Sequence, residues 1–238
     1  MRKKAENSPY ISCIVAAAGK GSRMGADVNK IFLEFGGMPV LAHTLLALER
    51  CDAIHEIVIV TSEEDMLGCK DIAAEFSINK VKTITLGGAM RQDSVRNALQ
   101  EISPKTEIVL IHDGARPLLT EDVIQSVIRG VEEHKAAAAG VACKNTLKIA
   151  DDEQFILSTP DRNHMYEIQT PQGFNRDLII LAHQKAVENH IQATDDCYLA
   201  EQLGIPVKIV PGDYRNIKIT TPEDLALAEL FWEIHQER

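Results

Sequence analysis

Residues 11–30 read ISCIVAAAGKGSRMGADVNK, so an apolar run leads directly into a glycine-rich, cationic segment. The run Ile11–Ala17 has the length and composition of a buried β-strand. Small residues after such a strand let backbone N–H groups approach anionic oxygens, and neighbouring cations add positive charge. The residues concerned are Gly19, Gly21, Gly25, Lys20, Arg23 and Lys30. The segment therefore indicates a phosphate-binding loop at the end of a strand.

The glycine spacing fits neither of the two common phosphate-binding motifs. A Rossmann fingerprint, G-x-G-x-x-G, opens a helix directly, whereas helical periodicity here begins only near Val40. A Walker A loop has four residues between its glycines and then Gly-Lys-Ser/Thr, which the sequence GKGS does not match. The glycines alone would also suit an ordinary surface turn. The cations within the segment favour a loop that surrounds a flexible triphosphate.

Strand and helix patterns alternate along the rest of the chain. Five apolar runs have the length of buried strands: Ile11–Ala17, Glu56–Thr61, Val81–Leu86, Ile108–His112 and Ala137–Ala142. Apolar residues with helical spacing lie between them, at 41–48 and, after a predicted N-cap at Thr120, at 124–131. The alternation predicts an α/β fold, in which helices on both faces cover a mostly parallel sheet and ligands bind beyond the carboxyl ends of its strands.

A last helix is predicted to begin at residues 221–224, Thr-Pro-Glu-Asp, which supply a cap, a first-turn proline and two acids. Its apolar face would be formed by Leu227, Leu230, Phe231 and Ile234. Lys218 is predicted to lie on a strand before this helix, within reach of bound phosphates.

Residues 144–169, KNTLKIADDEQFILSTPDRNHMYEIQ, break the alternation because they contain no helical period. The pieces TLKIA and FILST, joined by an acidic turn, predict a β-hairpin, and we call residues 143–168 the arm. The pattern leaves two alternatives open. The arm packs on another subunit, or it is a solvent-exposed hairpin on its own domain.

Composition limits the class of protein. The chain has 238 residues, 45% of them hydrophobic, and a formal net charge of −10, which argues against a broad nucleic-acid or acidic-membrane surface. Five scattered cysteines without a C-x-x-C pair indicate reduced thiols and a cytoplasmic protein. The start MRKK followed by ISCIVAAA resembles a signal peptide, but the polar residues 6–9 separate the charges from the short apolar run.

A polar segment, LGGAMRQDS (residues 86–94), follows the third predicted strand. Gly87 and Gly88 free the backbone for a close approach, and the Ser94 hydroxyl can donate or accept a hydrogen bond. The segment suits the edge of a nucleobase, or equally a capped turn into a helix over 91–101.

A second polar segment, HDGARP (residues 112–117), follows the fourth strand. Asp113 at this strand end is placed for ribose hydroxyls or a divalent cation, and Arg116 suits an anionic second substrate. His112 is predicted to orient the turn rather than to catalyse.

Seven segments in order then resemble one enzyme family: AAAGKGSRMG…NK, GGxxRQDSV, HDGARP, TPDR, QTPQGF, TDD and NIKITTPEDLALAE. Together they are similar to the 2-C-methyl-D-erythritol 4-phosphate cytidylyltransferases, from about Ile11 to Leu230. The resemblance implies one GT-A-type nucleotidyltransferase domain over residues 1–238 with a Rossmann-like sheet. It also implies Mg²⁺ as cofactor and CTP and methylerythritol phosphate as substrates. In this family the arm reaches into a partner's active site, so the resemblance further implies a homodimer, with neither nucleic-acid nor membrane partners.

The resemblance also implies roles for individual residues. The triphosphate would be bound at Ala17, Ala18, Gly19, Lys20, Gly21, Arg23 and Lys30. The cytosine would be read by Gly88, Ala89 and Ser94. Ribose and metal would meet Asp113, and the α-phosphate would meet Lys218, which with Arg23 and Lys30 forms the catalytic set. The methylerythritol phosphate would be received by Arg116, Thr146, Arg162, Thr170, Thr194 and Thr220.

Other functions remain possible from the sequence. The nearest alternative is a ribitol-5-phosphate cytidylyltransferase, and a more distant one is a sugar-nucleotide pyrophosphorylase. A catalytically silent nucleotide-binding protein is disfavoured because Arg23, Lys30 and Lys218 occur together. The family's frequent acidic pair is replaced here by Ala89 and Met90, which puts the strictness of CTP selection in doubt unless the backbone reads the base.

Overall fold

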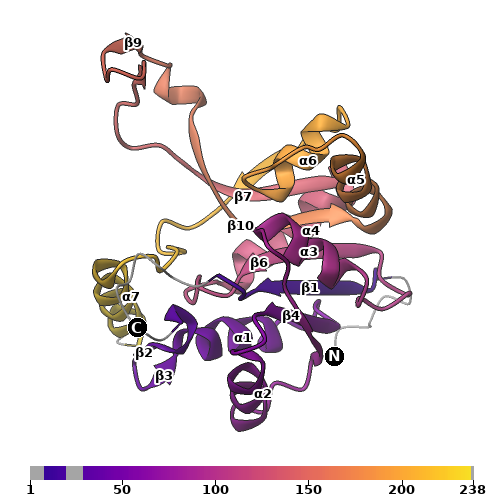
Figure 1. Ribbon diagram of the computed structural model, residues 1–238. Coiled ribbons are helices and arrows are strands. Elements are labelled where there is room, and N and C mark those ends of the chain that lie inside the picture. Colours follow the sequence, from indigo (N-terminus) through magenta and orange to yellow (C-terminus); the bar gives the residue numbers. More distant parts are fainter. Residues whose placement is uncertain (1–7, 20–28, 237–238) are drawn as a thin grey trace.

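The computed structural model describes residues 8–19 and 29–236. Its centre is a seven-stranded sheet in the order β11-β7-β10-β6-β1-β4-β5 (Figure 1). The strands are β1 (Ile11–Ala16), β4 (Glu56–Thr61), β5 (Val81–Leu86), β6 (Ile108–Asp113), β7 (Ala136–Ala142), β10 (Tyr166–Asn175) and β11 (Lys208–Pro211). The five predicted strands are confirmed to within one residue at each end.

Helices cover both faces of this sheet. One apolar core joins alternate strand residues to α1 (Val40–Arg50), α2 (Met66–Glu75) and α4 (Glu121–His134). The other core joins the opposite strand residues to α3 (Arg91–Leu99), α5 (Arg176–Glu188) and α6 (Asp196–Gln202). The period-2 alternation of a strand sends its neighbouring side chains into different cores, as with Val15 and Ile14. The predicted α/β fold with a mostly parallel sheet is therefore confirmed.

One strand of the described sheet runs against the others. β10 is antiparallel to both β6 and β7, whereas β1, β4, β5 and β6 pair in parallel and β11 pairs in parallel with β7. The sequence predicted neither β10 nor β11, and it assigned residues 166–168 to the arm. The chain instead enters the main sheet at Tyr166, where Tyr166 is in register with Ala142.

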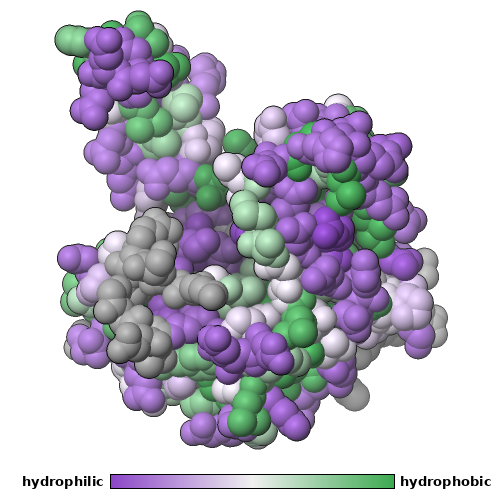
Figure 2. Space-filling model, viewed as in Figure 1, coloured by the Kyte–Doolittle hydropathy of each residue, from purple (hydrophilic) through white to green (hydrophobic). Residues whose placement is uncertain are grey.

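The arm leaves the body between β7 and β10 (Figure 1). Its hairpin consists of β8 (Ile149–Ala150) and β9 (Ile156–Ser158), which confirms the predicted hairpin. Figure 2 shows green, hydrophobic surface on the projecting lobe. Several large apolar side chains of the arm are exposed, namely Leu147, Ile149, Phe155, Ile156 and Leu157. The arm thus carries apolar surface that the described part of its own chain leaves exposed.

The last helix, α7 (Pro222–Gln236), begins where predicted but turns a different face inward. It packs with Ala228, Leu225 and Trp232 on a small core that includes Phe35, beside the short strands β2 (Glu34–Phe35) and β3 (Met38–Pro39). The residues predicted for its buried face are exposed or half-buried: Leu227, Leu230, Phe231 and Ile234. That prediction was wrong because Trp232 packs over Gly36, where a Cβ atom would lie 2.8 Å from the ring, and this contact turns the leucine face outward.

Two further sequence predictions concern helix caps and a strand. Thr120 is at the N-cap position of α4, but its side chain makes no capping hydrogen bond. Helix α7 begins at Pro222 with two acids in its first turn, as predicted, and the Asp224 carboxylate accepts hydrogen bonds from the backbone N–H groups of Thr220 and Thr221. Lys218 lies in an irregular segment rather than in the predicted strand. Within the described residues, no helix combines the length and apolarity needed to cross a bilayer.

Candidate active site

A cavity of about 740 Å³ opens where the carboxyl ends of β1, β4, β5 and β6 meet. This size is within the range of small-molecule sites, and the position is the one that open α/β sheets use for ligands. Many of its lining residues come from the segments singled out in the sequence: Ala17, Ala18, Gly19, Lys30, Gly87, Gly88, Ala89, Ser94, Asp113, Lys218 and Thr220. Lys20, Gly21 and Arg23 lie outside the described residues.

Asp113, the last residue of β6, is the charged centre of this cavity. Its Oδ2 atom lies 2.9 Å from Lys218 Nζ and 3.4 Å from Arg116 Nε, and its Oδ1 atom lies 3.6 Å from Arg91 Nε. Burial alone would raise the pKa of this carboxyl, but the three cations hold that pKa far below its ordinary value. Asp113 is therefore ionised at any physiological pH.

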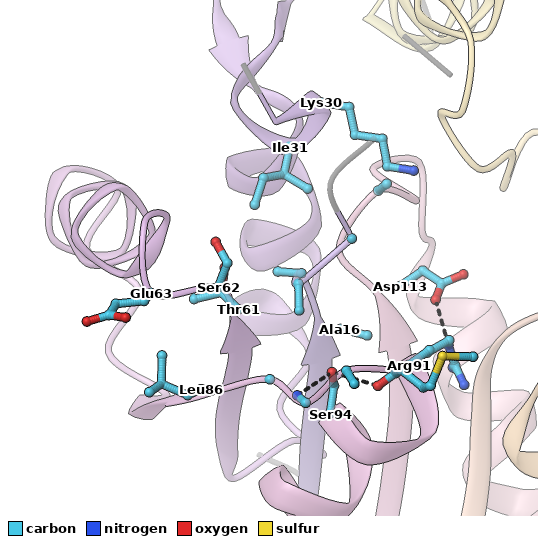
Figure 3. A pocket seen from close by; sticks show the side chains of 18 of the residues that line it. Ala16, Lys30, Ile31, Thr61, Ser62, Glu63, Leu86, Arg91, Ser94 and Asp113 are labelled. Atoms are coloured by element: carbon cyan, nitrogen blue, oxygen red, sulfur yellow. Dashed lines mark hydrogen bonds and ion pairs between the residues drawn. The ribbon is translucent and has the colours of Figure 1, made fainter. Parts of the chain in front are cut away.

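The β1 side of the cavity is formed, among the described residues, by Ala16–Gly19 and by Lys30 and Ile31. Asn29 caps a short 3₁₀ helix, Lys30–Phe32, and its side-chain amide donates a hydrogen bond to Asp65 Oδ2 at 2.8 Å. This pairing fixes the segment that carries Lys30. Figure 3 shows Lys30 on the side of the cavity opposite Arg91 and Ser94. The loop therefore brings one cation to the cavity from β1, while Lys218 brings another from the segment before α7.

The turn before α3 forms another wall. The Ser94 hydroxyl accepts a hydrogen bond from Gly88 N at 3.0 Å and donates one to Met90 O at 3.1 Å. A Cβ atom on Gly87 would lie 2.8 Å from both Ala18 Cβ and Ser94 Oγ, so only glycine lets the turn meet the β1 loop this closely. The predicted turn into a helix is thus confirmed, and Ser94, which shapes it, also lines the cavity.

Thr170 binds the backbone of Asp113, and His112 in turn binds Thr170. Asp113 N donates to Thr170 Oγ1 at 3.0 Å, and the same oxygen lies 3.0 Å from His112 Nδ1. His112 Nε2 lies 3.2 Å from the carbonyl oxygen of Arg116, which can only accept, so Nε2 carries the proton and Thr170 donates to Nδ1. Burial lowers the pKa of His112 to about 4. A neutral imidazole therefore holds the turn, as the sequence predicted.

Some predicted substrate residues do not line the cavity. Thr146 and Arg162 are exposed on the arm, where Arg162 donates a hydrogen bond to Lys144 O at 3.1 Å. Thr194 is exposed before α6, and Thr170 is buried and does not line the cavity. Thr220 lines it, with its hydroxyl 2.7 Å from Asp224 Oδ2. One chain therefore brings together most of the predicted nucleotide set and only part of the predicted acceptor set.

The sequence reasoning missed Arg91. Its guanidinium lines the cavity and contacts both Asp113 and Asp196, the latter at 2.7 Å from Nη1. The local signal for Arg91 is its place in the segment GGAMRQDS, where a cation lies between the glycines and the serine.

Two carboxylates line the described part of this cavity, the exposed Glu63 and the buried Asp113. The described residues contain no group of three or more histidine, cysteine, aspartate or glutamate side chains arranged to hold a metal. Mg²⁺ commonly takes one or two carboxylates together with substrate phosphates and water. The ionised Asp113 fits a metal that arrives with a polyphosphate, rather than one held by the protein alone.

Comparisons with known proteins agree on one family. The family model for 2-C-methyl-D-erythritol 4-phosphate cytidylyltransferase matches residues 11–233. The protein of that name from Caldanaerobacter subterraneus subsp. tengcongensis is 47% identical over 222 residues, covering 93% of this chain and 98% of that one. The one from Clostridium botulinum strain Langeland is 44% identical over 222 residues, covering 93% and 97%.

A solved structure gives the same answer. The 4-diphosphocytidyl-2C-methyl-D-erythritol synthase from Anaerococcus prevotii has a TM-score of 0.84 at 35% identity and covers 95% of this chain and 97% of that one. The nucleotidyltransferase fold and the family resemblance inferred from the sequence are thereby confirmed, and the ribitol-5-phosphate alternative is not favoured. The chain belongs to the 2-C-methyl-D-erythritol 4-phosphate cytidylyltransferase family of nucleotidyltransferase enzymes.

Proposed function

We propose that this enzyme transfers the cytidylyl group of CTP to 2-C-methyl-D-erythritol 4-phosphate, giving 4-diphosphocytidyl-2-C-methyl-D-erythritol and pyrophosphate in non-mevalonate isoprenoid biosynthesis. The observation that carries the proposal is the cavity at the carboxyl edge of the sheet, which Lys30 and Lys218 line together with Gly19, Gly87 and Gly88. Its cations suit a triphosphate, and its turn suits a base.

The reaction needs no general base from the protein. The attacking group is a phosphate monoester, which is largely dianionic near pH 7 because its second pKa is about 6. His112, the imidazole beside Asp113, is buried and occupied by Thr170 and by the carbonyl of Arg116. The chain contributes by positioning the two phosphates in line and by neutralising charge.

Three cations, Arg23, Lys30 and Lys218, would neutralise that charge. The α-phosphate gains charge on its nonbridging oxygens as the acceptor oxygen attacks and pyrophosphate departs. Lys218 lies against Asp113 at 2.9 Å, so it would exchange part of this contact for a phosphate oxygen. Backbone N–H groups at Ala17–Gly21 would hold the leaving pyrophosphate.

The other ligands follow from the cavity wall. Backbone groups of Gly88 and Ala89, together with Ser94, would read the cytosine edge, so the absence of an acid at Ala89 and Met90 is compatible with CTP. Asp113 would contact the ribose and hold Mg²⁺, which when bound with the nucleotide neutralises phosphate charge. The buried and free cysteines support a reducing, cytoplasmic setting.

The acceptor site would be completed by a second subunit. Arg116, Thr170, Thr194 and Thr220 are on the body, whereas Thr146 and Arg162 are on the arm, which projects from it (Figure 1). The exposed apolar residues of the arm, including Phe155 at 66% exposure, need a cover. We therefore take residues 1–238 as one domain that forms a homodimer, with the partner's arm at each cavity.

A substrate panel tests the activity. Pyrophosphate release is measured with each nucleoside triphosphate, Mg²⁺, and either methylerythritol phosphate or ribitol 5-phosphate. We expect turnover with CTP and methylerythritol phosphate, and a loss in Lys30→Ala of roughly 10²- to 10³-fold in kcat with a smaller change in KM. Lys70→Ala, on the exposed side of α2, is the matched control. No release from CTP and methylerythritol phosphate would overturn the proposal.

A further inference from the structure

Arg91 occupies a position that the reaction described above leaves unused. It is the first residue of α3 and directly follows the turn Gly87–Met90 that forms one cavity wall. Figure 3 shows its side chain directed at Asp113, with a dashed line between the two. Arg91 therefore links the base-facing turn to the carboxylate at the end of β6.

Arg91 contacts a different oxygen of the Asp113 carboxylate from the one that Lys218 and Arg116 contact. Lys218 and Arg116 face Oδ2, at 2.9 Å and 3.4 Å, whereas Arg91 faces Oδ1 at 3.6 Å. A carboxylate held on both oxygens cannot rotate toward one side. Without Arg91, both oxygens of Asp113 could turn toward Lys218, and the lysine would be neutralised more completely.

Arg91 is itself held from behind by Asp196. Nη1 of Arg91 lies 2.7 Å from Asp196 Oδ2, and the side chain of Asp196 is only 1% exposed. The other oxygen of Asp196 lies 3.2 Å from His183 Nε2, and its backbone N donates to Gln172 Oε1 at 3.0 Å. Burial would raise the pKa of Asp196, but Arg91 and His183 keep it below its ordinary value. A fixed, ionised group thus sets the direction of the guanidinium.

We propose that Arg91 is a positioning residue, anchored by the buried Asp196, that holds Asp113 so that Lys218 stays available to the nucleotide. The inference rests on the proposed function for its catalytic readout. Arginine is required because its planar fork reaches two carboxylates from different elements, whereas lysine offers one point charge. Asp196 acts on the reaction only through Arg91.

The test is a double-mutant cycle on Arg91→Gln and Asp196→Asn, with pyrophosphate release measured over a range of CTP concentrations. We expect Arg91→Gln to lower kcat/KM for CTP by roughly 10- to 100-fold, the usual effect of removing a group that orients a ligand from behind. Asp196→Asn should lower it less, and the double variant should lose no more than Arg91→Gln alone. Arg91→Lys should recover only part of the loss.

Arg96→Gln is the matched control, since Arg96 is on the same helix, pairs with Asp93 at 2.9 Å and does not line the cavity. Multiplicative losses in the double variant, or kcat/KM of Arg91→Gln within twofold of the control, would overturn the inference. Thermal midpoints identify variants that do not fold, and Arg91→Lys then carries the comparison. The same double-mutant cycle is also measured as CTP affinity by calorimetry, which needs no turnover. An inactive wild type would then count against the proposed reaction, and the CTP affinities of the variants would still decide the inference.

Discussion

At the residue scale, two adjacent buried side chains at the end of β6 differ in charge: Asp113 is ionised and His112 is neutral. Asp113 stays ionised because Lys218, Arg91 and Arg116 surround it. His112 stays neutral because it is fully buried, with hydrogen-bond partners that suit an uncharged ring. Above about pH 4 the acid sensitivity of the strand end therefore comes from the histidine, because the aspartate stays ionised in both the folded and the unfolded chain there.

We expect His112 to reduce stability below neutral pH. Its pKa is lowered to about 4 in the folded chain from 6.5 in the unfolded one, so between these values only the unfolded chain takes the proton. The stabilising contribution is complete above pH 6.5 and is lost as the pH falls toward 4, and it amounts to about 3 kcal/mol over the whole window. Urea unfolding at pH 7.5 and 5.0 measures it.

His112→Gln should lower the unfolding free energy at both pH values, because its hydrogen bonds to Thr170 and Arg116 are lost or altered. It should also flatten the decrease between them by about 2 kcal/mol. His164→Gln is the control, since His164 is on the arm with its side chain 84% exposed. A variant at His112 that keeps the full wild-type pH dependence would contradict this account.

The sequence could indicate Asp113 and Lys30 because each is close to a glycine-containing segment at a strand end. It could not indicate the anchor of Arg91, because Asp196 is 105 residues further along the chain. A local pattern shows which side chains are charged. Only the packing of α3 against α5 and α6 shows which charges meet.

At the element scale, α7 shows how an apolar pattern can mislead. The leucines and the isoleucine of the helix repeat at helical spacing, yet Leu230 is 50% exposed and Trp232 faces the core. Gly36 has φ +55° and leaves space where a Cβ atom would lie 2.8 Å from the Trp232 ring. The ring also meets His43 edge-on, with centroids 6.0 Å apart.

We therefore expect Trp232→Ala to lower the unfolding free energy by about 2 kcal/mol, because a half-buried aromatic ring and its packing are lost. Leu230→Ala should change it by less than about 0.5 kcal/mol. Chemical denaturation with tryptophan-independent detection, such as far-ultraviolet circular dichroism, compares the two. Equal losses from both variants would show that the leucine face is the buried one.

β10 escaped prediction for a different reason. Its sequence, YEIQTPQGFN, contains Pro171 and Gly173, which usually argue against a strand in the middle of a sheet. The strand tolerates them because its register shifts between Ile168 and Gln172, and because Gly173 lies close to Val127 and Val131 of α4. Tertiary packing here overrides a local preference.

At the scale of the whole molecule, the split between cavity and arm predicts shared active sites. If the partner's arm completes each cavity, Lys30→Ala and Arg162→Ala inactivate different halves of the same site. A one-to-one mixture, allowed to exchange subunits, should then regain about a quarter of the wild-type activity through heterodimers with one intact site. Sedimentation measures the dimer, and pyrophosphate release measures the recovery.

Two controls accompany this mixture. Each variant alone should stay inactive after the same treatment, and Phe155→Glu in the Arg162→Ala chain should abolish the recovery by weakening the interface. A mixture that remains as inactive as its components, while dimers exchange, would contradict shared sites.

The place where the arm leaves the sheet has an evolutionary consequence. The chain departs at the end of β7 and returns on β10, and these strands are paired at Ala142 and Tyr166, with Cys143 N donating to Met165 O at 3.0 Å. Departure and return therefore coincide, so an insertion or deletion in the arm leaves the register of the sheet unaltered. During evolution the arm can therefore be lengthened, shortened or replaced as a unit. Such changes would alter the choice of partner subunit and leave the sheet and its cavity unchanged.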